Sequence, residues 1–92
     1  MLEGLLPVGT VVLLKESTRR LMIIGVCQRE VASDVIWDYA GCLYPEGYMG
    51  ADKVYLFNHD QIEHIYSIGY QDEDQKAFKE KVDILCDELR NR

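Results

Sequence analysis

The segment GTVVLLKESTRRLMIIGVCQ, residues 9–28, holds two apolar runs separated by the polar tetrapeptide Glu16-Ser17-Thr18-Arg19. Short apolar and β-branched runs with polar turn residues between them are typical of strands, and so short a connection favours an antiparallel hairpin. Gly25 lies inside the second run. Because glycine weakens the middle of a strand, it indicates a bulge or a sharp bend at this point. The segment therefore predicts a strongly bent antiparallel sheet.

Two further strands are expected on either side of a loop. Residues 35–44 alternate, which places Val35, Trp37, Tyr39 and Leu43 on one face and Asp38, Ala40 and Cys42 on the other. Gly41 is a second candidate for a bend. Residues 45–52 contain one proline and two glycines, a composition typical of a loop, and residues 53–57 form a short fourth strand.

The next segment is expected to form one helical turn and a fifth strand. The side chain of Asn58 can cap a turn over residues 58–61. Residues 62–69 then alternate, which predicts a strand, and a helix through Ile62 and Ile65 is the competing interpretation.

From residue 72 onward the apolar period changes to that of a helix, which we expect over residues 72–90. Asp72 and Gln75 have the spacing of a capping box. The spacing of the apolar residues, with Cys86 and Ile84 beside them, predicts a stripe along one face: Ala77/Phe78, Val82, Leu85 and Leu89. We expect this stripe to pack on the protein's own sheet, and the alternative is that part of it contacts a partner helix.

These elements predict an α+β fold: a small, strongly bent antiparallel five-stranded sheet or SH3-like barrel with a C-terminal amphipathic helix. With 92 residues, the chain is expected to form a single domain, residues 1–92, with a β-rich part at about 8–70 and the helix at 72–90.

The charge of the chain excludes several classes of partner. Sixteen acidic and ten basic side chains give a net charge of -6 and a pI of about 4.7. Nucleic acids and anionic membranes both attract basic surfaces, so we expect no nucleic-acid partner and no membrane partner. Glu3 stands where a signal peptide would carry positive charge, and no apolar run approaches the ~20 residues of a membrane span. The sequence thus predicts a cytoplasmic protein.

No pattern in the chain points to catalysis, a metal or a cofactor. Cys27, Cys42 and Cys86 are widely spaced and include no Cys-x-x-Cys pair, so we expect buried or half-buried free thiols. His59 and His64 match no metal-ligand spacing, and His59 is expected to be a capping or surface residue. We therefore predict a protein that is not an enzyme and has no metal, cofactor or catalytic site.

Candidate partner-binding residues lie in the middle of the chain: Tyr48, Met49, Asp38 and Tyr55. Tyrosine and methionine are enriched at protein interfaces, so outward-facing Tyr48 and Met49 would form a contact patch. We expect Asp38 on the solvent face of the sheet, or hydrogen-bonded to a neighbouring turn. An edge strand at residues 53–57 could also pair across a two-fold axis to form a homodimer.

Five segments together resemble a family of small Gram-positive bacterial proteins, domain of unknown function 4176: LPVGTVVLLK (6–15), RLMIIG (20–25), WDYAGCLYPEG (37–47), LFNH (56–59) and IGY (68–70). The resemblance extends from about Leu5 to the terminal helix. Members are commonly encoded near type VII secretion genes and their LXG-type toxins, and the family has no established catalytic residues to transfer.

The resemblance implies a cytosolic accessory, adaptor or chaperone-like protein that binds an LXG-type toxin or a small helical secretion protein. The alternative is an immunity protein that neutralises a secreted toxin, since an acidic surface could cover a basic active site.

Overall fold

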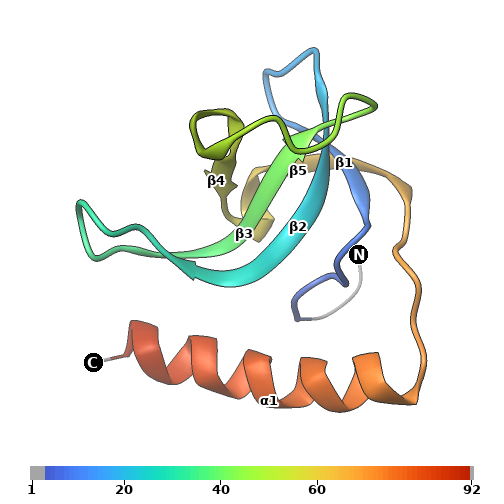
Figure 1. Ribbon diagram of the computed structural model, residues 1–92. Helices are drawn as coiled ribbons and strands as arrows, with labels where there is room; N and C mark the ends of the chain where they lie inside the picture. The colour runs from blue at the N-terminus through green and yellow to red at the C-terminus, as the bar shows by residue number, and fades with distance from the viewer. Residues whose placement is uncertain (1–3, 92) are drawn as a thin grey trace.

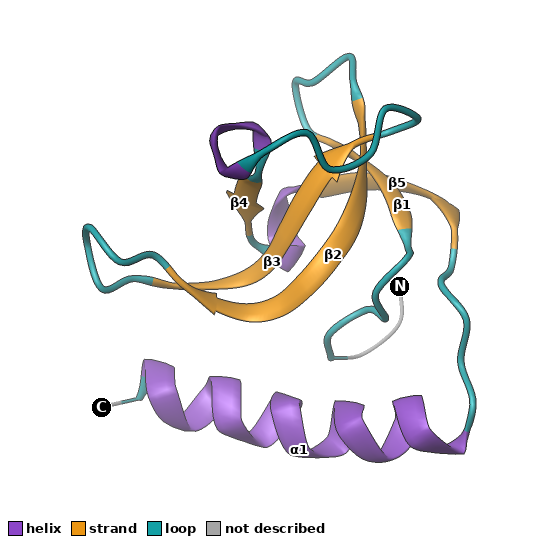
Figure 2. Cartoon of the chain, in the orientation of Figure 1, coloured by secondary structure: helices purple, strands orange, loops and turns teal. Residues whose placement is uncertain are grey.

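The computed structural model describes residues 4–91. It contains five strands followed by one long helix (Figures 1 and 2), which are β1 (Val11–Leu14), β2 (Arg20–Arg29), β3 (Ile36–Leu43), β4 (Tyr55–Phe57), β5 (Ile62–Ser67) and α1 (Glu73–Arg90). Single 3-10 turns at Ala51–Lys53 and His59–Gln61 precede β4 and β5. Each predicted strand and the predicted helix is thus present, although the fourth strand begins only after the turn at Ala51–Lys53.

The five strands form one antiparallel sheet in the order β4-β3-β2-β1-β5. β4 and β5 are neighbours in the chain but lie at opposite edges, so the sheet must curl to bring them within reach of one 3-10 turn. Among the described residues, no pairing joins β4 to β5, so the sheet is not closed. The predicted α+β fold is confirmed as the bent open sheet with a C-terminal helix.

The bend at Gly25 is confirmed. The register between β2 and β3 shifts between Ile23 and Gly25, opposite Gly41 and Ala40. Gly41 lies against the ring of Phe57, where an added Cβ would be 3.0 Å from Cε1. Gly41 therefore permits β4 to lie close against β3, while Gly25 accommodates the bulge.

The strict alternation predicted for the fifth strand is wrong. The pairing of β5 with β1 shifts register twice, between Val11 and Val12 and between Leu13 and Leu14. Each shift inserts one residue and reverses the faces beyond it. As a result Ile62 is buried and Ile65 packs against the same core, although simple alternation places them on opposite faces.

The main core lies between the concave side of the sheet, the N-terminal segment and α1. The N-terminal segment passes between the sheet and the helix (Figure 1), and Leu5 and Leu6 enter the core there. The rings of Tyr39 and Phe57 have centroids 5.3 Å apart at the centre of this core. It comprises Leu5, Leu6, Val12, Leu21, Ile23, Tyr39, Phe57, Ile62, Val82 and Cys86.

Helix α1 begins at the predicted cap, because the Asp72 side chain accepts a hydrogen bond from the backbone N–H of Gln75 at 2.9 Å. The reciprocal bond of a capping box is absent among the described residues, since the side-chain oxygen of Gln75 has no hydrogen-bond partner. The predicted burial of its apolar stripe, however, is wrong in part. Val82 is buried, but Phe78 and Leu85 are 56% and 49% exposed. Cys86, which the stripe places at its flank, is buried instead.

Polar contacts explain this orientation of α1. Asp83 accepts a hydrogen bond from the backbone N–H of Leu5 at 2.9 Å, and Arg90 pairs with Asp38 at 2.6 Å. Both residues lie on the Cys86 side of the helix, to one side of the apolar stripe. These contacts turn that side toward the sheet and leave one edge of the stripe facing outward.

Candidate functional site

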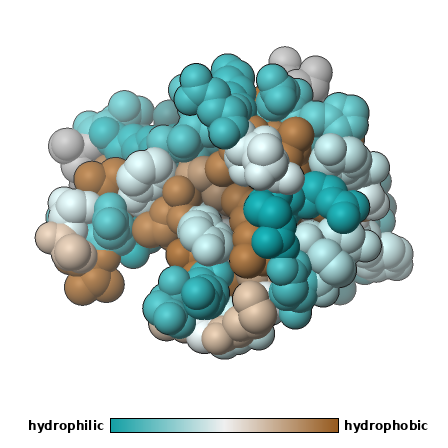
Figure 3. All heavy atoms as spheres, turned by 90° about the horizontal axis from the view of Figure 1, so that it is seen from above, coloured by the Kyte–Doolittle hydropathy of each residue, from teal (hydrophilic) through white to brown (hydrophobic). Residues whose placement is uncertain are grey.

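The end of the sheet away from α1 carries an apolar cleft of about 360 Å³, which we call the upper cleft. Figure 3 views the molecule from this end and shows apolar residues in a hollow between polar ones. The apolar residues come from the ends of β1, β2 and β3 and from β4: Leu14, Leu21, Leu43, Tyr55 and Leu56. Ser17 and Arg19 of the β1–β2 turn complete the lining.

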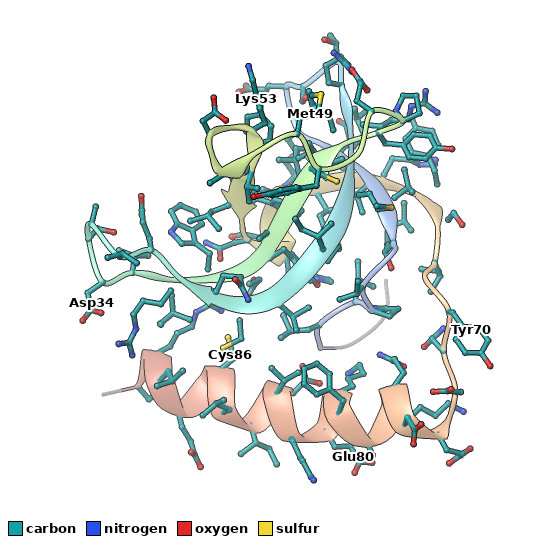
Figure 4. The ribbon with its side chains drawn as sticks, in the orientation of Figure 1. Asp34, Met49, Lys53, Tyr70, Glu80 and Cys86 are labelled. Carbon is teal, nitrogen blue, oxygen red and sulfur yellow. The ribbon has the colours of Figure 1, made fainter. Side chains whose placement is uncertain are left out.

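Three of the four predicted contact residues lie at this end of the molecule. The β3–β4 connection runs across it, and Figure 4 places Met49 there, far from Cys86 on α1. Tyr48, Met49 and Tyr55 are all exposed, as an interface requires, and Tyr55 lines the upper cleft.

Charged side chains link the β3–β4 connection to the β1–β2 turn and to the start of β2. Arg19 pairs with Glu46, and this guanidinium lowers the pKa of the Glu46 carboxyl. The guanidinium of Arg20 lies over the ring of Tyr44 at 5.0 Å and the ring of Tyr66 at 5.9 Å. The upper cleft thus has an apolar floor, with the charged Arg19 and the aromatic Tyr55 in its lining.

Asp38 lies apart from the other three predicted residues. It is only 7% exposed, so its expected place on a solvent face is wrong. The alternative, a hydrogen bond to a neighbouring turn, is confirmed, because Asp38 accepts from the backbone N–H of His59 at 2.7 Å. With its bond to Arg90, this contact ties β3, the His59–Gln61 turn and the end of α1 together.

His59 belongs to the same polar network. Its Nδ1 lies 2.6 Å from the hydroxyl of Tyr39, which also accepts a hydrogen bond from the backbone N–H of Leu6 at 2.9 Å. Burial raises the pKa of Tyr39, so the hydroxyl stays protonated and can donate to Nδ1. The expected cap is present beside it, since Gln61 accepts a bond from the Asn58 N–H. His59 is therefore a half-buried structural residue as well as part of a capped turn.

An open groove of about 640 Å³ lies between this network and α1. Its walls include the carboxylates of Asp38, Asp83, Asp87 and Glu88, and we call it the acidic groove. Arg90 also lines it and pairs with Asp38, and Asp83 pairs with Lys79, so Asp87 and Glu88 contribute most of its negative charge. Over residues 4–91, no three His, Cys, Asp or Glu side chains gather as a metal site would require. Basic groups of a partner are the chemistry that such a groove favours.

The three cysteines are free thiols, with Cys42 and Cys86 buried and Cys27 half-buried, as predicted. Cys86 on α1 lies beside Cys27 on β2. Burial, followed by the neighbouring Cys27, raises the pKa of the Cys86 thiol to about 12. The thiol contact thus occupies one of the few points where α1 touches the sheet.

Stability is expected to fall at alkaline pH because of Cys86. Its pKa is raised from 9.0 to about 12 on folding, so above pH 9 the unfolded chain loses a proton that the folded chain keeps. The free energy of unfolding then falls as pH rises through this window, with a slope approaching ~1.4 kcal/mol per pH unit. Urea denaturation between pH 8 and 10.5 measures the slope, and Cys86→Ala should flatten it. Equal slopes for the two proteins would exclude this assignment.

A second apolar surface lies along α1, where the sequence left open that part of the apolar stripe contacts a partner helix. Exposed Val8, Tyr70 and Phe78 line a hollow of about 330 Å³ between the N-terminal segment and the helix. The four-three-four spacing of the stripe signals an apolar face, but spacing alone does not show which edge the sheet leaves uncovered.

Within the described residues, no helix has both the length and the apolarity needed to cross a membrane.

Comparison with known proteins identifies a family. Neither the curated proteins nor the solved structures contain a match to the chain. The family model described as "Domain of unknown function (DUF4176)" matches residues 5–78, from the N-terminal segment into the first half of α1. The chain therefore belongs to the DUF4176 family.

Proposed function

We propose that this protein is a non-enzymatic accessory or adaptor protein of type VII secretion. It acts in the cytoplasm of a Gram-positive bacterium and binds an LXG-type toxin or a small helical secretion protein. The observation that carries the proposal is the upper cleft, an apolar hollow with exposed Tyr48, Met49 and Tyr55 at the same end of the molecule.

The upper cleft has the composition of a protein-binding site. Interfaces bury an apolar centre inside a polar rim, and tyrosine and methionine are enriched in them. Here leucines form the floor, while Arg19 and Glu46 bring charge to the periphery. An apolar side chain of a partner would fill the hollow, and the tyrosines would cover it from water.

The link to secretion rests on the family. Members are commonly encoded near type VII secretion genes and LXG-type toxins, which supports a role in preparing such a toxin for export. The net charge of -6 supports a protein partner over a nucleic acid.

Substitution of Tyr55 by aspartate is expected to weaken the complex with the partner. A charge would replace an aromatic contact at the cleft, and the loss of a central aromatic contact typically lowers affinity by about 30-fold. Co-expression with the amino-terminal domain of a toxin encoded beside the gene, followed by co-purification, measures the effect.

Val31→Asp is the control, because Val31 is also an exposed apolar residue but lies in the β2–β3 turn, outside the lining of the upper cleft. Wild-type protein that recovers no complex with either the toxin domain or the neighbouring small helical proteins would refute the proposal. Equal losses for the two variants would place the interface elsewhere.

The acidic groove favours a second candidate, an immunity protein. The carboxylates of this groove would face basic residues in the active site of a toxin. Binding would then map to the carboxy-terminal domain of the toxin, and expression would protect sensitive cells. An accessory protein would bind without protecting them.

A homodimer stays a prediction. β4 is an edge strand, as this arrangement requires, and exposed Tyr55 lies on it. Pairing of two copies through β4 would compete with a partner for Tyr55.

A further inference from the structure

Helix α1 carries an apolar strip that its own fold leaves half uncovered. The strip, which we call the helix seam, consists of Phe78, Val82, Leu85 and Leu89. Val82 is buried and Leu89 is half-buried, whereas Phe78 and Leu85 are exposed. The spacing of four, three and four residues is that of positions d and a in a heptad repeat. The seam therefore offers one side of a helix-to-helix contact.

The seam runs along most of the helix. From Phe78 to Leu89 it covers twelve residues, a rise of about 16 Å along the helix axis. Val8 and Tyr70 extend it at the N-terminal end, where they share the 330 Å³ hollow with Phe78. At the other end, Leu89 lines a hollow with Ile36 and with Arg29 and Asp34 of the β2–β3 hairpin. This length suits about three turns of a second helix.

Three exposed charges flank the seam on its outer side: Asp74, Lys81 and Glu88. They repeat every seven residues in the order negative, positive, negative, so they form a straight line beside the seam. The residues three and four positions before and after Asp74 are all uncharged, and so are those three and four positions before and after Lys81. These two charges thus have no oppositely charged neighbour at helix-pairing distance on α1.

This order of charges argues against a second copy of the chain. In an antiparallel pair centred on Lys81, the two Lys81 side chains would face each other, and Asp74 would face Glu88 of the other copy. In a parallel pair, the outer charges of one copy would have to contact the opposite flank of the seam on the other copy. That flank carries Lys79 and Cys86 and faces the protein's own core. Like charges placed opposite each other oppose association.

We propose that the helix seam binds an amphipathic helix of a different protein. This helix carries an apolar heptad stripe flanked, at seven-residue spacing, by a positive, a negative and a positive side chain. The order positive, negative, positive reads the same in both directions. The partner helix therefore needs this pattern whether it runs parallel or antiparallel to α1. The seam and the upper cleft lie at opposite ends of the molecule, so one adaptor would hold two partners at once.

Two synthetic peptides test the proposal with the full-length protein. Each is a three-heptad helix with leucine at a and d, and they differ only in the flanking line, which reads Lys-Glu-Lys in one and Glu-Lys-Glu in the other. We expect the Lys-Glu-Lys peptide to bind roughly tenfold more tightly, since three exposed charge pairs each contribute a few tenths to one kcal/mol. Calorimetric titration at low and at high salt measures the ratio, which should shrink as salt rises.

Variants locate the binding on α1. The double variant Phe78→Ser and Leu85→Ser should abolish binding of both peptides while circular dichroism stays unchanged, because both side chains are already exposed. The triple variant Asp74→Lys, Lys81→Glu and Glu88→Lys should reverse the preference between the peptides. Equal affinity for the two peptides, or binding that survives the serine double variant, would overturn the proposal. Tyr55→Asp should leave peptide binding unchanged, so failure here is separate from failure at the upper cleft.

Discussion

Replacing Gly69 by alanine is expected to destabilise the protein by about 3 kcal/mol or more, enough to unfold a marginal domain of this size. Gly69 crosses the backbone of Val8 and Gly9 and donates its N–H to the Thr10 hydroxyl at 3.0 Å. An added Cβ would lie 2.1 Å from the Val8 carbonyl oxygen and 2.9 Å from its carbon. Both are backbone atoms, so no side-chain rotation relieves the overlap. The N-terminal segment would have to leave its place under the sheet.

Chemical denaturation measures this effect, with Gly47→Ala as control. Gly47 has a φ of 84° but no atom within 4 Å of an added Cβ, so its substitution tests backbone conformation without crowding. That cost should be about 1–2 kcal/mol. A Gly69 variant no less stable than the Gly47 variant would show that the segments at this crossing can separate freely.

Asp38→Ala is expected to lower the free energy of unfolding by about 2–4 kcal/mol and to loosen the end of α1. The substitution leaves the backbone N–H of His59 without its acceptor and Arg90 without its carboxylate. Arg90 would keep its bonds to Asn58 at 2.8 Å and to the Ile36 carbonyl at 3.1 Å. The helix should therefore fray at its C-terminal end before it detaches.

Two measurements separate this effect from a general loss of stability. A double-mutant cycle with Arg90→Ala isolates the coupling of the pair, and hydrogen exchange should rise first in the last turns of α1. Arg29→Ala is the control, because its pair with Asp34 is exposed and should contribute under about 1 kcal/mol. An Asp38 variant that matches this control would mean that Asp38 does not hold the helix.

Several features follow from local sequence. The hairpin with its bend at Gly25, the turn over Asn58–Gln61 and the cap of α1 at Asp72 each depend on residues that are near neighbours in the chain. The loop composition around Tyr48 and Met49 likewise predicts exposure, and both are exposed. Such features are governed by backbone preferences and short-range hydrogen bonds, which a sequence pattern states directly.

Other features depend on contacts between distant residues. The faces of β5 follow from two register shifts against β1, and Asp38 is buried because the His59 turn and Arg90 come to it from later in the chain. No local pattern contains either contact.

The sequence by itself determined that the chain would form a bent antiparallel sheet followed by an amphipathic helix. Only the tertiary structure decided which edge of that helix faces the sheet. The bonds from Asp83 to Leu5 and from Arg90 to Asp38 span 78 and 52 residues, and they turn the Cys86 side inward. Phe78 and Leu85 stay outside because satisfying buried polar groups outweighed the burial of every apolar side chain.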